Sequence, residues 1–119
     1  MNPADIAAWV VTVIHATFAL TEMFLWQLPK VHTRLGFTAA TAAVAAPVVR
    51  NAGVYNAFLA VALGAIILLP AYPQEIRTYL LGCAIVAGIV GAATLKWTVF
   101  VIQSVPAVIA LTLWLARSN

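Results

Sequence analysis

The residues most able to do chemistry in this 119-residue chain interrupt long apolar runs. His15 and Glu22 are seven residues apart in the first run, which is two helical turns, so they share one helix face. Trp26 lies on that face one turn further on. An ionisable side chain inside an apolar span is unfavourable and therefore marks a functional site by default. Glu22 is the candidate general acid or base, with His15 and Trp26 as candidate binding residues.

Further polar residues interrupt the second and last apolar runs. Asn51 and Tyr55 are one turn apart and point the same way, whereas Asn56 points about a quarter turn away. Gln103 interrupts the last run. The predicted topology puts these side chains in the same half of the membrane as Glu22, so we expect a polar pocket between the first, second and fourth spans. There Tyr55, Asn51 and Asn56 would orient or polarise a substrate oxygen, and Gln103 would help to bind the substrate.

Each of these residues also has a purely structural interpretation. Glu22 would either snorkel to water or pair with Lys30 or Arg34. His15 would be a packed histidine bonded to a neighbouring hydroxyl, a role favoured over metal or haem ligation because no second ligand is in view. No metal site is expected.

The amides have equally plain roles. Asn51 would cap the start of the second helix. Asn56 and Gln103 would form interhelical hydrogen bonds, as amides commonly do in membranes.

The composition indicates what must position these residues. The chain is 65% hydrophobic and 8% charged, with a mean hydropathy of +1.05, whereas a soluble domain carries roughly a quarter charged residues. Its surface must therefore face the lipid bilayer. The net charge of +3 comes from Lys and Arg near the ends of apolar runs, so it indicates membrane topology rather than nucleic acid binding.

Four apolar runs are long enough to cross roughly 30 Å of hydrocarbon as helices. We expect an all-α, four-helix transmembrane bundle forming one domain over residues 1–119, with spans at about 3–25, 51–69, 74–95 and 98–116. The stretch 37–46 is rich in Ala and Thr and is followed by Pro47. It predicts a short interfacial helix between the first two spans.

The distribution of Lys and Arg predicts the orientation. Four of these residues fall on one side of the membrane and two on the other; the first group is Lys30, Arg34, Arg50 and Lys96, and the second is Arg77 and Arg117. Because cytoplasmic loops carry the excess of positive charge, we expect a multi-pass protein of the cell inner membrane with both termini outside.

The third run carries a stripe of small residues, namely Ala84, Ala87, Gly88 and Gly91. Such a stripe lets another helix approach closely. The partner is either a helix of the same chain or one of a second subunit. Because four short helices bury little of their own surface, we expect a homo-oligomer packed through this stripe.

Four groups of residues are distributed along most of the chain: His15 with EMFLW at 22–26, NAGVYNAFLA at 51–60, GCAIVAG at 82–88 with GAAT at 91–94, and QSVPA at 103–107. Together they resemble the signatures of the domain-of-unknown-function 1304 (DUF1304) family of small bacterial membrane proteins. The resemblance implies a four-helix membrane protein with polar residues at these positions, and it implies no activity. The first loop of that family is usually more acidic than the Ala/Thr-rich loop of this chain.

A fainter likeness in size and topology is to styrene oxide isomerase, a four-helix membrane enzyme that binds haem. Its haem-ligating histidine is not matched, because the corresponding stretch here carries Asn51, Gly53 and Asn56. The cofactor stays unknown, and haem would need His15 as its ligand.

Three functions stay open at this point. The first is a small, isomerase-like membrane enzyme that acts on an apolar substrate, with Glu22 as the acid or base. The second is a small transporter or proton-coupled permease with Glu22 and His15 as a relay. The third is a structural or accessory membrane subunit whose polar groups fix helix packing.

Overall fold

A computed structural model describes residues 1–69 and 71–117 of the chain. Within those two ranges the protein is helical and has no strand, which confirms the predicted all-α bundle. Four long helices form its body: α1 (Pro3–Leu20), α3 (Ala39–Leu68), α4 (Gln74–Thr94) and α5 (Thr98–Arg117). A π-helical turn η1 (Thr21–Leu25), a short helix α2 (Pro29–His32) and a 3-10 turn η2 (Thr33–Leu35) connect α1 to α3.

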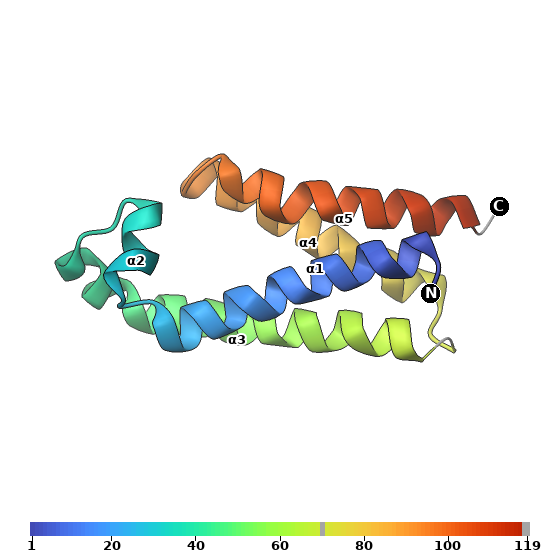
Figure 1. Ribbon diagram of the computed structural model, residues 1–119, viewed down its shortest axis with the longest axis horizontal. Helices are drawn as coiled ribbons and strands as arrows, with labels where there is room; N and C mark the ends of the chain where they lie inside the picture. The colour runs from blue at the N-terminus through green and yellow to red at the C-terminus, as the bar shows by residue number, and fades with distance from the viewer. Residues whose placement is uncertain (70, 118–119) are drawn as a thin grey trace.

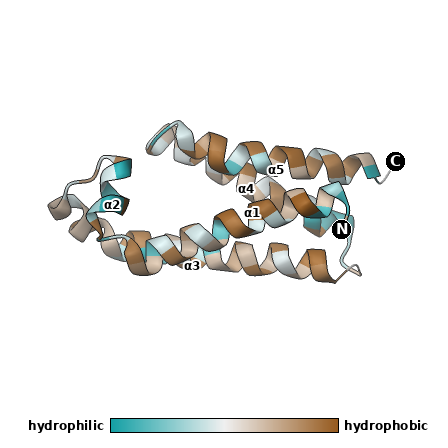
Figure 2. Cartoon of the chain, viewed as in Figure 1, coloured by the Kyte–Doolittle hydropathy of each residue, from teal (hydrophilic) through white to brown (hydrophobic). Residues whose placement is uncertain are grey.

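The four long helices make this a multi-pass membrane protein. Pro3–Leu25 and each of the other three helices are long and apolar enough to cross a bilayer. Hydrophobic residues run along all four, while hydrophilic residues gather mainly toward the two ends of the bundle (Figure 2). Both termini lie at the same end (Figure 1), as an even number of spans requires.

The second long helix differs from its predicted form. α3 runs unbroken for 30 residues from Ala39 to Leu68, with Pro47 inside it, so the prediction of a separate interfacial helix at 37–46 is wrong. The predicted span at 51–69 is, up to Leu68, part of this longer helix. Thr38 and Thr41 form a reciprocal capping box at its start. Proline removes one donor and crowds one carbonyl, but the flanking alanines favour helix strongly, and a broken helix would leave further backbone groups unbonded.

The unbroken α3 also changes the role of Asn51 and the shape of one end of the bundle. Asn51 lies inside the helix, so its predicted role as an N-cap is wrong. Thirty residues make a helix of about 45 Å, which exceeds the roughly 30 Å of the hydrocarbon core. The first part of α3 therefore projects with α2 and η2 past the α4–α5 turn (Figure 1). We call this projection, residues 26–46, the lobe.

A small core of its own holds the lobe together. Trp26 is buried, and its indole N–H donates a hydrogen bond of 2.9 Å to the carbonyl of Ala42. Phe37 and His32 both lie edge-on to the Trp26 ring. His32 is also buried, and its Nδ1 is 2.9 Å from the carbonyl oxygen of Phe37. These contacts fix the segments of the lobe against one another.

At the opposite end, near the termini, the helices pack closely through small side chains. We call this region the closed half. Its buried residues come from all four long helices: Ala4, Ala8, Val11, Leu63, Leu81, Ala84, Ala107, Ala110 and Trp114. Alanine at the crossing of α1 and α5 lets the two backbones approach, which is how helices gain packing contacts in lipid.

α4 and α5 are adjacent antiparallel helices, as their short connection predicts. A Cβ added at Gly88 would collide with Ser104, and one added at Gly91 would collide with Val99. The Ser104 hydroxyl donates to the carbonyl of Ile85 at 2.8 Å. The two glycines therefore serve contact within the chain, and a subunit interface built on them is wrong because α5 already occupies that face.

Candidate functional site

The site begins where α3 passes closest to η1. A Cβ at Gly53 would be 2.7 Å from the Met23 Cγ, 3.0 Å from the Glu22 Cβ and 3.1 Å from the Ala19 carbonyl oxygen. These distances are too short for a real side chain, so only glycine allows this approach. Asn56 is one turn further along α3, and the approach brings its amide within reach of α1.

Asn56 bridges the two ionisable residues of the first span. Its Nδ2 donates to the Glu22 Oε2 at 2.8 Å, and its Oδ1 is 2.8 Å from the Nδ1 of His15. The prediction that His15 and Glu22 share a face is thus confirmed, because both reach the same amide. A carbonyl oxygen only accepts, so the Nδ1 of His15 is the donor.

The hydrogen bond at Nδ1 sets the chemistry of the other nitrogen of His15. In a neutral imidazole whose Nδ1 carries the proton, Nε2 has the free lone pair. His15 is 0% exposed, and its Nε2 has no hydrogen-bond partner among the described residues. The histidine is therefore a buried support for Asn56 and not a solvent-facing group.

Glu22 itself lies in an irregular part of the first span. It is the second residue of η1, and single π-helical turns inside α-helices are frequent at functional sites. The side chain is partly buried and bonds Asn56 rather than a cation. Among the described residues it has no ion pair with Lys30 or Arg34, so the structure does not show the alternative of an ion-paired glutamate.

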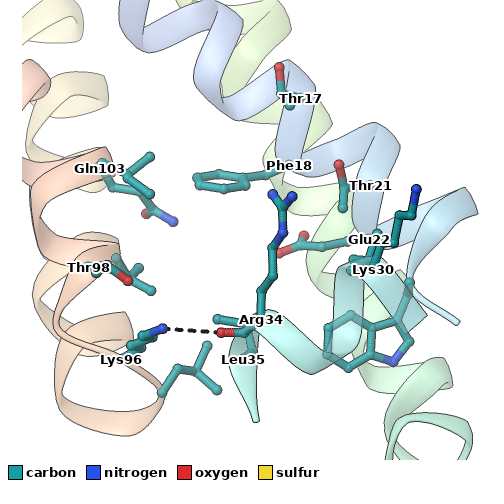
Figure 3. Close-up of a pocket in the computed structure, with 15 residues that line it drawn as sticks. Thr17, Phe18, Thr21, Glu22, Lys30, Arg34, Leu35, Lys96, Thr98 and Gln103 are labelled. Carbon is teal, nitrogen blue, oxygen red and sulfur yellow. Dashed lines mark hydrogen bonds between the residues drawn. The ribbon is translucent and has the colours of Figure 1, made fainter. Parts of the chain in front are cut away.

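A cavity of about 700 Å³ lies in front of Glu22. One wall comes from α1, η1, α2 and η2, and the other from the α4–α5 turn and α5 (Figure 3). The lining consists of Thr17, Phe18, Thr21, Glu22, Trp26, Lys30, Val31, Arg34, Leu35, Leu95, Lys96, Thr98, Val99, Ile102 and Gln103. The volume falls within the usual range of small-molecule sites, about 300–1,000 Å³.

The polar groups of the cavity converge from both walls. Figure 3 shows Arg34 reaching toward Glu22 and Phe18, while Gln103 points in from α5. The Oε1 of Gln103 is buried and has no hydrogen-bond partner among the described residues. Such a buried acceptor usually has a partner. The Lys96 Nζ donates to the Arg34 carbonyl at 3.4 Å and joins the two walls.

Two predicted site residues lie away from this cavity. Asn51 is exposed, and Tyr55 is 63% exposed and packs edge-on against Phe58 on the outer face of α3. They do not bond Glu22, whose partner is Asn56. The predicted pocket therefore keeps Glu22 and Gln103, with Asn56 behind the wall rather than in it. Sequence spacing placed Asn56 correctly off the Tyr55 face, and Gly53 was the signal for which face turns inward.

Trp26 and two basic residues also belong to the cavity lining. Trp26 lines the cavity, although its N–H is engaged with Ala42. Lys96 was noted for topology alone, and Arg34 for topology and as a possible ion-pair partner of Glu22, yet both line the cavity. No group of three His, Cys, Asp or Glu side chains in residues 1–69 and 71–117 is placed to hold a metal ion.

The opposite end of the bundle carries a separate charged cluster. Asp5 and Arg117 are 3.7 Å apart, and the guanidinium of Arg77 lies 3.8 Å from the centre of the Trp114 ring. Arg117 also lies over that ring at 5.4 Å. Here a carboxylate and an aromatic face both contact cations, unlike the cavity end.

Comparison with known proteins gives a family and no activity. No curated protein and no solved structure matches the chain. The sequence pattern of the protein family of unknown function DUF1304 matches residues 9–115, a range that includes His15, Glu22, Asn56 and Gln103. With nearly its whole length matched in this way, the chain belongs to the DUF1304 family.

Proposed function

We propose that this protein is a small membrane enzyme of the isomerase type, in which Glu22 transfers a proton to or from a substrate bound in the cavity. The single observation that carries the proposal is the hydrogen-bonded chain His15–Asn56–Glu22, which ends at a carboxylate in the cavity wall. Asn56 and His15 are positioning residues, because they fix the carboxylate from behind. A catalytic acid or base oriented by a further group is a recurring arrangement in enzymes.

The cavity supports a substrate with an apolar body and a few polar atoms. Phe18, Leu35 and Ile102 are among the apolar lining residues. Gln103 lies across from Glu22 in Figure 3, and its side-chain amide would hold a polar atom of the substrate. Apolar walls with a small number of placed polar groups are typical of small-molecule sites.

Glu22→Gln tests this function because it keeps the shape and the hydrogen-bonding capacity of the side chain but cannot transfer the proton. Protein in nanodiscs would be incubated with a cellular lipid and apolar metabolite extract, and the products compared by mass spectrometry. We expect a conversion that the variant slows by about 10²–10⁴-fold, the usual contribution of a general acid or base.

Glu75→Gln is the matched control for that experiment, since Glu75 is an exposed carboxylate in the first turn of α4, outside the cavity lining. It should convert the same compound at the wild-type rate. Identical product profiles for wild type and Glu22→Gln would rule out the enzyme.

A proton-coupled transporter would use the same three residues as a relay. The relay would need a continuation beyond His15, but the Nε2 of that histidine is buried and bonds no described residue. The hydrogen-bonded residues His15 and Asn56 are therefore better suited to holding Glu22 in place than to passing protons onward. Proton uptake into proteoliposomes, followed with a pH-sensitive dye, should be the same for wild type and Glu22→Gln.

We also propose that the protein lies in the inner membrane with both termini outside. Lys30, Arg34 and Lys96 lie at the end of the bundle opposite the termini, and positive charge favours the cytoplasm. A periplasmic reporter fused to the C-terminus should be active and a cytoplasmic reporter silent; the reverse pattern contradicts this orientation.

For the homo-oligomer we propose a different face from the one expected. The outer face of α4 carries a shallow apolar groove lined by Gly82, Cys83, Val86 and Ala87, among others. Gly82 has open space where a Cβ would be, so a second copy could approach closely there. Mild oxidation should link two copies through Cys83, and a protein that stays monomeric under those conditions contradicts this interface.

A further inference from the structure

The charges around the cavity are unbalanced. Lys30, Arg34 and Lys96 line it, against Glu22 as the one carboxylate in the lining. None of the three cations forms an ion pair with a described residue. The remaining two carboxylates of the chain are far away, because Asp5 pairs with Arg117 at the terminal end and Glu75 begins α4 there.

Topology alone does not account for where these cations lie. Positive charge on the cytoplasmic side would be satisfied by any exposed position at that end, and Arg50 is such a position, exposed on α3 and outside the cavity lining. Arg34 instead reaches into the cavity beside Phe18 (Figure 3). Lys96 comes from the opposite wall and is bonded to the backbone of Arg34. The fold of the lobe has brought two cations from distant parts of the sequence to one mouth.

The rest of the lining is apolar and comes from both walls. Phe18 and Leu35 lie on one side, and Leu95, Val99 and Ile102 lie on the other. A volume of about 700 Å³ is suited to one polar head and one chain. Arginine and lysine at the mouth would form charge-assisted hydrogen bonds with carboxylate or phosphate oxygens, while the chain would lie against the apolar walls.

We propose that the cavity binds a single-chain amphiphile with an anionic head, a carboxylate or phosphate held by Arg34 and Lys96 at the mouth. This inference deepens the proposed function and depends on it for the idea that the cavity takes a substrate. The head would lie beside the carboxylate of Glu22 in the cavity wall, so proton transfer would occur near the head end of the molecule.

Dodecanoate is a suitable probe, with dodecanol as the neutral molecule of the same chain length. Binding to the full chain in phosphatidylcholine nanodiscs would be measured by titration calorimetry, with empty nanodiscs subtracted. We expect dodecanoate to bind about tenfold more tightly than dodecanol, which corresponds to one charge-assisted hydrogen bond. Equal affinity for the two probes overturns the proposal.

Variants locate the preference for the anion. Arg34→Gln and Lys96→Gln should each reduce the preference for dodecanoate over dodecanol several-fold. Because the two residues lie on opposite walls, either variant can test the site if the other does not fold. Arg50→Gln is the matched control at the same end of the bundle and should leave the preference intact. An equal loss with Arg50→Gln would mean a diffuse surface charge and would overturn the site.

Two further measurements are needed. One identifies the source of the anionic head, and the other tests the binding site separately from the proposed enzyme. If phosphatidylglycerol in the nanodiscs competes with dodecanoate, the site takes the anionic head of a two-chain bilayer lipid, and the single-chain part of the proposal is overturned. If it does not compete, the occupant is a free single-chain amphiphile, as proposed. Glu22→Gln should keep the preference, because it removes a negative charge. Binding that persists when no Glu22-dependent conversion is found leaves the site standing and removes the enzyme.

Discussion

The two ends of the bundle are packed differently, although the same helices form both of them. At the terminal end, α1 and α5 meet through alanines such as Ala8 and Ala107, both fully buried. At the other end the same two helices carry Phe18 and Gln103 and enclose a cavity. The difference follows from side-chain size, since small residues let helix backbones approach and larger ones hold them apart.

The charged residues at the two ends of the bundle also differ in their partners. In the closed half Asp5 contacts Arg117, and Trp114 lies under the guanidinium of Arg77. At the cavity end Arg34 and Lys96 have no carboxylate partner among the described residues. The comparison teaches that the cations of the closed half contact a carboxylate or an aromatic ring of the same chain, whereas those of the cavity end present charged groups that a further molecule would bind.

The largest effect should come from enlarging a side chain in the closed half. Ala8→Leu adds volume at a position with no exposed surface, and overpacking a filled core costs about 3 kcal/mol at the upper end of the usual range. Unfolding in mixed detergent micelles would measure the loss of stability.

Thr17→Leu is the matched variant on the same helix, since Thr17 is exposed and lines the cavity. It should change stability by less than about 0.5 kcal/mol, as a surface substitution does. Equal losses for the two variants would show that the two halves are packed alike.

An intermediate effect should come from the amide that joins α3 to the first span. Asn56→Ala removes the partner of both His15 and Glu22, and leaving buried polar groups unpaired costs about 1–3 kcal/mol. The same micelle titration would report it.

Asn51→Ala is the control, because Asn51 is an exposed amide of the same helix. Its effect should be close to zero. If the Asn51 variant lost as much stability as the Asn56 variant, α3 would turn a different face toward α1 from the one described.

The smallest effect should come from the ion pair of the closed half. Arg117→Gln removes a partly exposed pair with Asp5, in which the Arg117 side chain is 49% exposed. Exposed pairs contribute about 0.2–1 kcal/mol and are screened by salt. Stability should therefore fall by less than about 1 kcal/mol, and the loss should shrink in high salt. A larger, salt-independent loss would show that the closed half depends on charge rather than on packing.

The sequence by itself determined the membrane class, the four apolar helices and the common face of His15 and Glu22. These follow from composition and from the helical period, which are local properties of the chain. It also identified Asn56 as a polar residue within the second long helix. It did not determine which face of α3 turns inward, because Tyr55 and Asn56 are adjacent in sequence and both polar.

Tertiary structure decided that choice through the contact of Gly53 with Met23, which fixes the rotation of α3 against the first span. It decided likewise that α3 continues through Pro47, since the capped, alanine-rich start of the helix offsets the one donor that proline removes. Arg34 and Lys96 are 62 residues apart, and no local pattern relates them. They meet because the folded lobe places the Arg34 carbonyl within reach of the Lys96 side chain on the α4–α5 turn, and a contact of that kind depends on the packing of distant segments rather than on the period of any one helix.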